Sequence, residues 1–389
     1  MVGLAARLWV SLFLPVRPSW DGVIYERAAR QLAAGYGYTL RMYDPGWPWA
    51  DLPTAFYPPG WPAALALLKL LEGPLWLDLV LQATLGALAI PLAAKIGGAL
   101  AGHRSARRAA WLVALWPGGW LISASWMGEP LFTLALGLAV LPLIRPSGAR
   151  PGKLGLSSLL FGFAAYVRPT ALAIAPLALV ARAWTGPSRR RRVAVSLVLT
   201  AVALVPMAPW MARNARRLDA PVVSSNGGAN LFVGTLGARF QRIPTELDCP
   251  PGPRELARDR CRRDHAIERI AADPTHWLTL SLAKVVHTFG YEMGPALQIG
   301  SGLGWTPPEE RPEVVALIVI CSAYWLALLG LALRSRGRRS PRRVLWACVF
   351  GVALLHFVFL GGDRYHLPLV PLIAALAASA KTTTRRSSQ

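Results

Sequence analysis

Charged residues are scarce in this sequence. Asp, Glu, Lys and Arg make up only 16% of its 389 residues, 54% are hydrophobic, and the mean hydropathy is +0.38. This fraction of charged residues is too low to cover the surface of a soluble protein of this length. The composition therefore argues against a soluble globular enzyme and predicts a protein whose main solvent is the lipid bilayer.

Acidic residues are the scarcer of the two signs, and several basic segments contain none. The chain has 42 Lys and Arg against 20 Asp and Glu, a formal net charge of +22. The acid-free basic segments are 103–108, 145–153, 188–192, 334–343 and 381–389. They separate apolar runs, and no nucleic-acid-binding motif accompanies them. The positive balance therefore indicates membrane topology and membrane lipids as partners, with no nucleic acid.

Apolar runs recur along the whole chain between these segments. Several are shorter than the roughly 20 residues usual for a spanning helix. The runs are 2–16, 76–98, 109–123, 131–145, 154–167, 170–184, 193–211, 313–333, 344–360 and 367–380. If all of them cross, every basic segment falls on the side of the N-terminus, which the positive-inside rule makes cytoplasmic. We expect an all-α polytopic protein of about ten transmembrane helices, a single membrane domain over 1–389 that keeps its first run.

Two long segments, 17–75 and 212–312, then face outside the cell. The first is expected to begin with a surface helix over 20–34 and to continue through a loop rich in Tyr, Trp and Pro. The run 61–71 is too short to cross and contains Lys69, so we expect a re-entrant or interfacial helix. The outer face should therefore carry amphipathic helices and loops.

The second outer segment contains a Gly-rich stretch, 224–235. It lacks the Lys-Ser/Thr ending of a phosphate-binding P-loop, so a turn is the better interpretation. The segment 275–290 is amphipathic and should lie along the membrane. His265 and Glu268 share a helix face, but no second His-Glu pair completes a metal site, and no G-x-S-x-G motif occurs.

Cysteine is also rare, with four in the chain. Cys321 and Cys348 lie within apolar runs, whereas Cys249 and Cys261 share the second outer segment. On an oxidising side of the membrane the latter two could form a disulfide, and two free thiols are the alternative.

Two acidic residues stand beside apolar runs on the outer side. Asp21 follows the first run, where a carboxylate can reach water and act as a base, although it could simply favour the positive end of a helix dipole. Glu129 occupies a tight turn before a Pro and has no sequence-adjacent cation. Glu129 is therefore a candidate metal ligand or second active-site acid, with helix capping as the alternative.

Three arginines occupy the outer ends of apolar runs: Arg168, Arg213 and Arg364. A guanidinium presents a fixed fork of donors that suits phosphate oxygens, so these residues could hold a lipid phosphate. Snorkelling to ordinary headgroups is the alternative.

Six fragments follow Asp21 in an order that resembles a known family. They are YERAARQLAAGYGY, TAFYPPGWPAALALL, SWMGEPLFTLAL, YVRPTALAIAP, PWMARNARRLDAPVVSSNGGANLFVGT and DRYHLPLVPLIAALA. This pattern, from Asp21 to Ala378, is similar to bacterial integral-membrane glycosyltransferases of the family 39 type. These are related to protein mannosyltransferases and to the aminoarabinose transferase of lipid A.

The resemblance implies a GT-C fold and a polyprenyl-phosphate-linked sugar donor, with transfer on the outer face of the cytoplasmic membrane. Asp21 matches the catalytic acidic residue, and Glu129 stands where relatives place a second acid that is sometimes a metal ligand, so a divalent metal remains open. We assign donor phosphate binding to Arg168, Arg364 and Arg213. Substrate contacts are expected from Tyr57, Trp61, Asn226, Asn230 and Tyr365.

The chain departs from this pattern in two ways. Relatives have an early acidic pair where this chain has only Asp21–Gly22, and some have a large C-terminal outer domain. Asp21 would then act alone as the base of an inverting transfer, and acceptor recognition would fall to 36–61 and 226–310. The acceptor itself is not indicated. A transporter or flippase of lipid-linked sugars, a polysaccharide polymerase and a non-catalytic relative are the alternatives.

Overall fold

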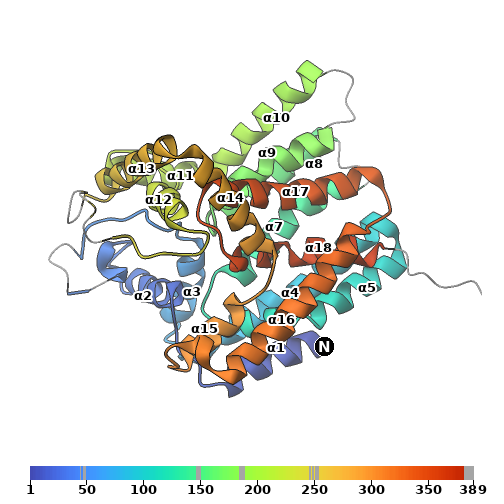
Figure 1. Cartoon of the computed structure of the whole chain (residues 1–389), viewed down its shortest axis with the longest axis horizontal. Coiled ribbons are helices and arrows are strands. Elements are labelled where there is room, and N and C mark those ends of the chain that lie inside the picture. Colours follow the sequence, from blue (N-terminus) through green and yellow to red (C-terminus); the bar gives the residue numbers. More distant parts are fainter. Residues whose placement is uncertain are drawn as a thin grey trace, which may run out of the picture.

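Helices make up most of the chain in the computed structural model (Figure 1). Within the described residues the only strand-like pairing is an isolated bridge between Thr39 and Pro53. The structure describes residues 1–43, 45–46, 50–145, 150–183, 189–244, 247, 249 and 254–380. The predicted all-α class is confirmed.

Four of the described helical stretches are long and apolar enough to cross a membrane. They are α4 (Leu75–Ala101), α16 (Pro312–Leu333), α17 (Arg339–Val358) and Ala194–Leu218, which joins most of α10 (Arg189–Leu204) to α11 (Ala208–Leu218). Shorter apolar helices are α1 (Val2–Phe13), α3 (Gly60–Leu70), α7 (Glu129–Ile144) and α9 (Thr170–Ala183). The chain is a helical membrane protein, and its number of crossings stays a prediction.

Three of the predicted runs do not form one continuous α-helix. The run 193–211 passes from α10 to α11 through a 3-10 turn, Val205–Met207. The run 109–123 is divided between α5 (His103–Ala114) and α6 (Pro117–Ile122). Pro117 has no amide hydrogen and forces the residue before it out of helical conformation, and Trp116 is accordingly extended. The run 367–380 begins with a 3-10 turn, and its α-helix, α18 (Val370–Ala378), has only nine residues.

The prediction of a turn at 224–235 is wrong. Residues Gly227–Leu236 form a helix, α12, which Asn226 immediately precedes. The Asp259 carboxylate accepts a hydrogen bond from the Ala229 amide at 2.9 Å, which satisfies a donor in the first turn of that helix. A carboxylate 30 residues away therefore stabilises a helix that its own glycines disfavour.

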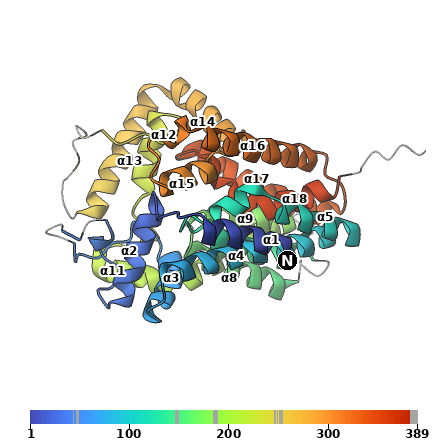
Figure 2. The same cartoon turned by 90° about the horizontal axis from the view of Figure 1, so that it is seen from below.

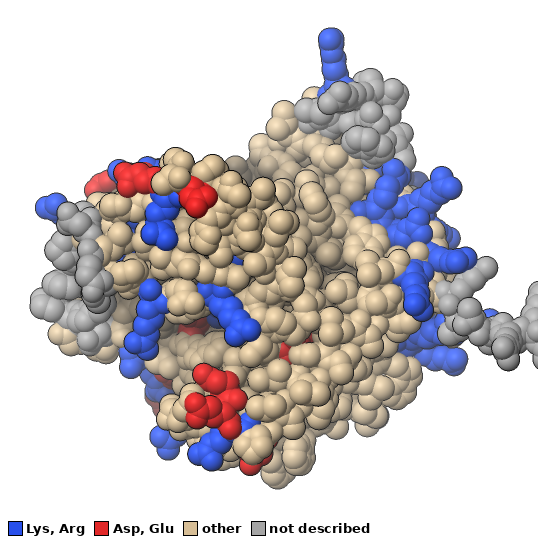
Figure 3. Space-filling view, in the orientation of Figure 1, with Lys and Arg blue, Asp and Glu red and all other residues tan. Residues whose placement is uncertain are grey.

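Three of the basic segments, 103–108, 145–153 and 334–343, gather at one end of the molecule, which we call the basic end. The Arg338 amide donates to the carbonyl of Leu100, just before α5 begins. Arg182, at the end of α9, donates to Ser340 and to the carbonyl of Arg145. Figure 3 shows Lys and Arg concentrated there, while the acidic side chains on the same face lie away from it. The described parts of these three segments thus share one side, as predicted, whereas 189–192 begins α10 and the tail 381–389 lies outside the described residues.

The opposite end, the acidic end, is built from the two long segments predicted to face outward. In Figures 1 and 2 the helices α2, α3, α11, α12 and α13 lie together there. The predicted helix over 20–34 is α2 (Asp21–Ala33), and α13 (Glu255–Ala272) and α14 (Pro274–Phe289) belong to the second segment. The buried Glu255 carboxylate accepts hydrogen bonds from Thr54, from the Ala55 amide and from Ser225, which joins the two segments. A disulfide links Cys249 to Cys261 of α13.

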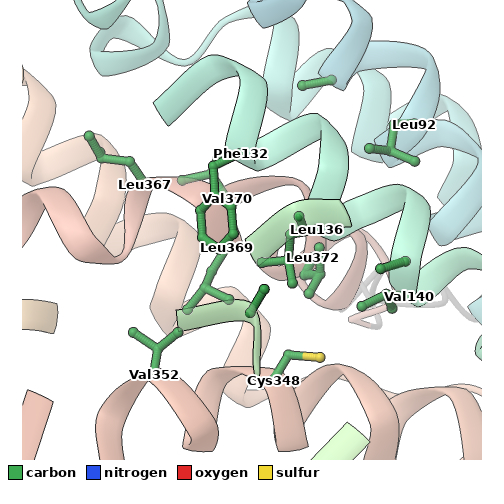
Figure 4. Packing of buried hydrophobic residues seen from close by; sticks show 14 of the residues in the cluster. Leu92, Phe132, Leu136, Val140, Cys348, Val352, Leu367, Leu369, Val370 and Leu372 are labelled. Carbon is green, nitrogen blue, oxygen red and sulfur yellow. The ribbon is translucent and has the colours of Figure 1, made fainter. Parts of the chain in front are cut away.

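The core lies between α4, α7, α17 and α18 (Figure 4). Leu136 and Val140 of α7 and Leu372 of α18 are completely buried there, beside Leu92 of α4 and Cys348 of α17. Side chains packed this closely fix the axial positions of α7 and of the segment before α18. The core thereby positions the first residue of α7 and the stretch 361–366 at the acidic end.

Candidate active site

Asp21 is the first residue of α2 and is held by two donors. Its Oδ2 accepts a hydrogen bond from Arg364 Nη1 at 2.8 Å, and its Oδ1 accepts one from the Tyr57 hydroxyl at 3.1 Å. The carboxylate side chain is 20% exposed. Gly22 presses against the Ser125 carbonyl so closely that a Cβ would come within 2.8 Å of that oxygen. The start of α2 is therefore fixed directly on the turn that precedes Glu129.

Glu129 is the first residue of α7 and is almost fully buried. Its Oε1 forms an ion pair with Arg168, which lies between α9 and α8 (Pro151–Ala165). The turn before it contains Trp126 at a positive φ of 53°, and the Trp61 indole donates to the Trp126 carbonyl at 2.8 Å. Trp61 is also buried, so its ring supports this turn. The ring is therefore not open to a sugar, in contrast to the predicted substrate contact.

The two ion pairs form one charge cluster, which we define as Asp21, Glu129, Arg168 and Arg364. Arg168 acts electrostatically on Asp21, and Glu129 acts on Arg364. The Tyr365 ring lies beside both guanidiniums, with its centroid 5.8 Å from Arg168 and 5.2 Å from Arg364. The cluster holds two negative and two positive charges, so it is balanced before any substrate enters.

The arginines keep the Asp21 carboxylate ionised. Burial opposes charge on this group, but the nearby Arg364, then Arg168 and the Tyr57 hydroxyl outweigh it and lower the pKa of Asp21 below its usual value. Burial and the charge of Asp21 raise the pKa of Tyr57 well above its usual range. Tyr57 is therefore a hydrogen-bond donor and Asp21 an acceptor at neutral pH.

Arg364 is positioned by its neighbours in sequence. The Asp363 carboxylate accepts hydrogen bonds from the amides of Met293 and Gly294, at the start of α15 (Gly294–Gly302). Tyr365 stacks on His356 of α17, with the ring centroids 4.0 Å apart. Asp363 was not predicted, because its partners are amides that carry no sequence signal.

A second buried pair follows directly after Tyr365. Nδ1 of His366 is 2.6 Å from the Thr288 carbonyl and Nε2 is 3.2 Å from Glu292, while the His366 ring stacks on Trp325 at 3.8 Å. Glu292 also accepts from the Trp116 indole at 3.0 Å. Sequence reasoning missed Glu292 and His366, although the run DRYH, rich in polar groups between apolar stretches, is a signal that could have found His366.

A third charged residue missed from the sequence is Arg7, buried in α1. Its Nη1 and Nη2 donate to the carbonyls of Gly3 and Val113, at 2.7 and 3.2 Å. Arg7 Nε and Glu129 Oε2 have no hydrogen-bond partner among the described residues, and both side chains line the same cavity of about 10 Å³. That volume is about the size of one water molecule. Arg7 is thus a second cation behind Glu129.

Three other predicted residues lie outside the charge cluster. Arg213 of α11 donates to the carbonyls of Tyr38 and Thr54, at 2.8 and 2.7 Å, so its guanidinium joins segments of the protein instead of standing free for a phosphate. Asn226 precedes α12 and Asn230 lies within it, not in a loop. The Asn230 carbonyl accepts from the Leu360 amide at 3.1 Å, next to the segment that contains Arg364.

The donor groups do not fit a bound metal ion. Both carboxylates of the charge cluster are already paired with a guanidinium. Across the part of the chain that the structure describes, the only group of three possible ligands close enough to share an ion is Cys249, Cys261 and His265. Its two sulfurs are joined in a disulfide, which removes the thiolates that would bind a metal.

No family model matches the sequence, and no curated protein matches it significantly. Among solved structures, the oligosaccharyltransferase of Archaeoglobus fulgidus aligns in its apo form with a TM-score of 0.52 and 13% identity, over 97% of this chain and 49% of that one. Its complex with Zn and sulfate gives a TM-score of 0.52 and 14% identity, over 97% and 48%. ArnT from Cupriavidus metallidurans bound to undecaprenyl phosphate reaches only 0.45, at 14% identity over 97% and 76%, too low to support an argument.

The likeness concerns fold alone, and the family 39 resemblance stays a prediction. This chain spans about half the length of the archaeal enzyme. Over nearly all of its own residues, it shares the helical fold of the archaeal oligosaccharyltransferase.

Proposed function

We propose that this protein is an inverting glycosyltransferase that moves a sugar from a polyprenyl-phosphate donor to an acceptor on the outer face of the cytoplasmic membrane. The observation that supports the proposal is the charge cluster. It brings one ionised carboxylate, Asp21, next to two guanidiniums suited to phosphate oxygens. The four residues come from separate parts of a chain whose fold is similar to that of an archaeal oligosaccharyltransferase, which supports the proposal.

Arg168 and Arg364 bind the donor phosphate in this proposal. A phosphate that enters a balanced cluster competes with Asp21 and Glu129 for the two guanidiniums. The polyprenyl phosphate is released as an anion, so these cations stabilise the charge that develops on the leaving oxygen. No strong general acid is required at that oxygen.

Asp21 accepts the acceptor's proton. When the phosphate draws Arg364 away from Asp21, the influence that lowers its pKa weakens, and the carboxylate becomes a stronger base. The acceptor oxygen or nitrogen attacks the anomeric carbon on the side opposite the phosphate. The bond from that carbon to the phosphate oxygen breaks, its electron pair leaves with the phosphate, the proton moves to Asp21, and the anomeric configuration inverts.

The proposal requires no divalent cation, because both carboxylates and both arginines have roles without one. Transfer by purified protein should be unaffected by EDTA. Loss of activity in EDTA, with recovery on adding back a divalent cation, would contradict this part of the proposal and give Glu129 and Asp21 the role of ligands.

The decisive experiment is native mass spectrometry of the detergent-purified protein and its Asp21→Asn variant, followed by a transfer assay with a panel of polyprenyl-phosphate sugars. We expect a co-purified donor that is enriched in the variant, whose mass gives the sugar and the prenyl length. If neither sample binds any such lipid, the proposal fails and a non-catalytic relative becomes the better interpretation. Donor lipid that binds both samples equally, with no transfer by either, would favour a transporter or flippase.

A further inference from the structure

A groove outside the charge cluster lies at the basic end of the molecule, between α9 and α17. Its volume is about 400 Å³. It is lined by Ala181 of α9 and by Arg342, Arg343, Trp346, Ala347 and Phe350 of α17. Nothing in the proposed transfer reaction uses these residues.

The lining residues of α17 are arranged in order of polarity along one helix face. Arg342, Trp346 and Phe350 are spaced four residues apart, so they share a face and rise by about 6 Å per step. Phe350 is therefore about 12 Å deeper along the helix than Arg342, whereas the headgroup layer of one leaflet is only roughly 5–8 Å thick. The Phe350 side chain is 59% exposed, which suits contact with acyl chains. Arg342, Trp346 and Phe350 therefore match, in that order, the headgroup layer, the interface and the hydrocarbon of one leaflet.

The polar side chains of the groove are held in place. Arg342 Nη1 donates to the Ser335 carbonyl at 3.1 Å, and the Trp346 indole donates to the Ser335 hydroxyl at 3.4 Å. Arg182 lies next to the groove, since it donates to Ser340 and is within electrostatic reach of Arg343. Three guanidiniums therefore converge at the mouth of an apolar groove.

The two helices that line the groove, α9 and α17, carry no acidic residue beside Arg342 and Arg343. The sequence contains no Asp or Glu between positions 130 and 218, nor between 314 and 362. This excludes acidic residues from α8, α9, α10 and α17 and from nearly all of α16. With no Asp or Glu on these helices to neutralise the groove, the nearest source of an anion in a membrane protein is a lipid headgroup.

We propose that this groove binds an anionic phospholipid from the leaflet at the basic end. Its phosphate and polar headgroup pair with Arg342 and Arg343, Trp346 lies at the level of the glycerol, and an acyl chain packs along Ala347 and Phe350. This inference does not depend on the proposed transferase activity.

The test is a lipid titration of delipidated, full-length protein in detergent, followed by native mass spectrometry. The probes are phosphatidylglycerol and phosphatidylcholine. We expect the wild type to prefer phosphatidylglycerol on the order of tenfold, because Arg342 and Arg343 attract an anionic headgroup. The double variant Arg342→Gln/Arg343→Gln should lose most of this preference.

Two matched variants separate the groove from general charge. Arg107→Gln/Arg108→Gln removes the same two charges from exposed positions of α5 at the same end, and it should keep the preference. Ala347→Trp keeps every charge but fills the groove, and it should weaken phosphatidylglycerol binding. Equal loss in both arginine pairs, or unchanged binding in Ala347→Trp, would overturn the proposal. A wild-type dimer that dissociates in the groove variants would instead identify a second copy of the chain as the occupant.

Discussion

The two ends of this molecule handle positive charge in opposite ways. At the acidic end, Arg168 and Arg364 are each paired with a buried or half-buried carboxylate of the chain itself. At the basic end, the sequence around α17 contains no acid, and Arg342 of α17 donates to a carbonyl while Arg182 of α9 donates to the Ser340 hydroxyl. Internal pairing fixes side chains for chemistry, whereas the lack of it leaves cations to be neutralised by the surroundings.

The difference suggests how to read an excess of arginine in a membrane protein. Most of the net charge of +22 comes from the short acid-free segments, and the described parts of three of them, 103–108, 145–153 and 334–343, meet at one end. The arginines that we propose to act in transfer are the few that lie near scarce acidic residues. The predictions below disturb the internal pairing and ask whether the contrast between the two ends holds.

The largest effect is expected from Asp21→Asn, which removes the proposed base while keeping the side-chain shape. Transfer should fall roughly 10²–10⁴-fold, the usual contribution of a general base. The measurement is the initial rate of sugar transfer from the donor identified by mass spectrometry. Asp51→Asn is the matched control, because Asp51 is exposed, pairs with Arg41 and lies on the same outer segment. A rate near that of wild type in Asp21→Asn would remove Asp21 from the role.

Arg364→Gln should both slow transfer and move its pH dependence. Arg364 lowers the pKa of Asp21, so the variant should have a higher Asp21 pKa and lose activity at a higher pH on the acid side. In the wild type, the lowered pKa of Asp21 also stabilises the folded state at any pH above the unfolded pKa of about 3.9. This contribution to the free energy of unfolding is lost as the pH falls through the lower pKa of the folded state. The pH–rate profiles of wild type, Arg364→Gln and Arg364→Lys test this expectation. An acid limb that stays in place would show that Asp21 is not the titrating group.

A double-mutant cycle between Arg7 and Glu129 tests the pairing across the small cavity. Arg7→Met should destabilise the wild type, because it removes a buried cation that lines the same small cavity as the buried Glu129. Arg7→Met should lower the free energy of unfolding by less in the Glu129→Gln variant than in the wild type. The expected coupling is roughly 0.5–3 kcal/mol, measured by thermal unfolding of the four proteins in detergent. Additive effects would mean that the shared cavity does not couple the two residues.

The smallest effect concerns Lys284, a buried cation at the acidic end that is held by carbonyls. Its ammonium donates to the carbonyls of Gly234 and Val358, both at 3.1 Å, and burial lowers its pKa to about 8. The unfolded chain binds more protons between pH 8 and its own pKa of about 10.4, so stability should rise with pH across that window.

Lys284→Gln should reduce the slope of the free energy of unfolding against pH by up to about 1.4 kcal/mol per pH unit. The measurement is the change in Tm between pH 8 and 10. Lys95→Gln, at an exposed position of α4, provides the comparison. If both variants keep the wild-type slope, other groups account for it.

Local sequence signals predicted the helical membrane class, the helix at 20–34 and the gathering of the basic segments. These depend on apolar length and on charge, which are properties of a single stretch. The pairing of Asp21 with Arg364 joins residues 343 positions apart, so only their separate placement at outer ends could be anticipated. Arg7 was hidden because a lone arginine in an apolar run carries no sign of its partner. The helix at Gly227–Leu236 escaped prediction because the Asp259 carboxylate that stabilises its first turn lies in α13.

The anchoring of residues 363–366 has a consequence for how this protein can change. Each of the four side chains contacts a different part of the fold. Asp363 binds the start of α15, and Arg364 binds the start of α2. Tyr365 stacks on His356, and His366 contacts the stretch from Thr288 to Glu292. Deleting or inserting one residue here would put all four contacts out of register at once. We therefore expect the length of this stretch to be less tolerant of alteration than any one of its residues, both in evolution and in the laboratory.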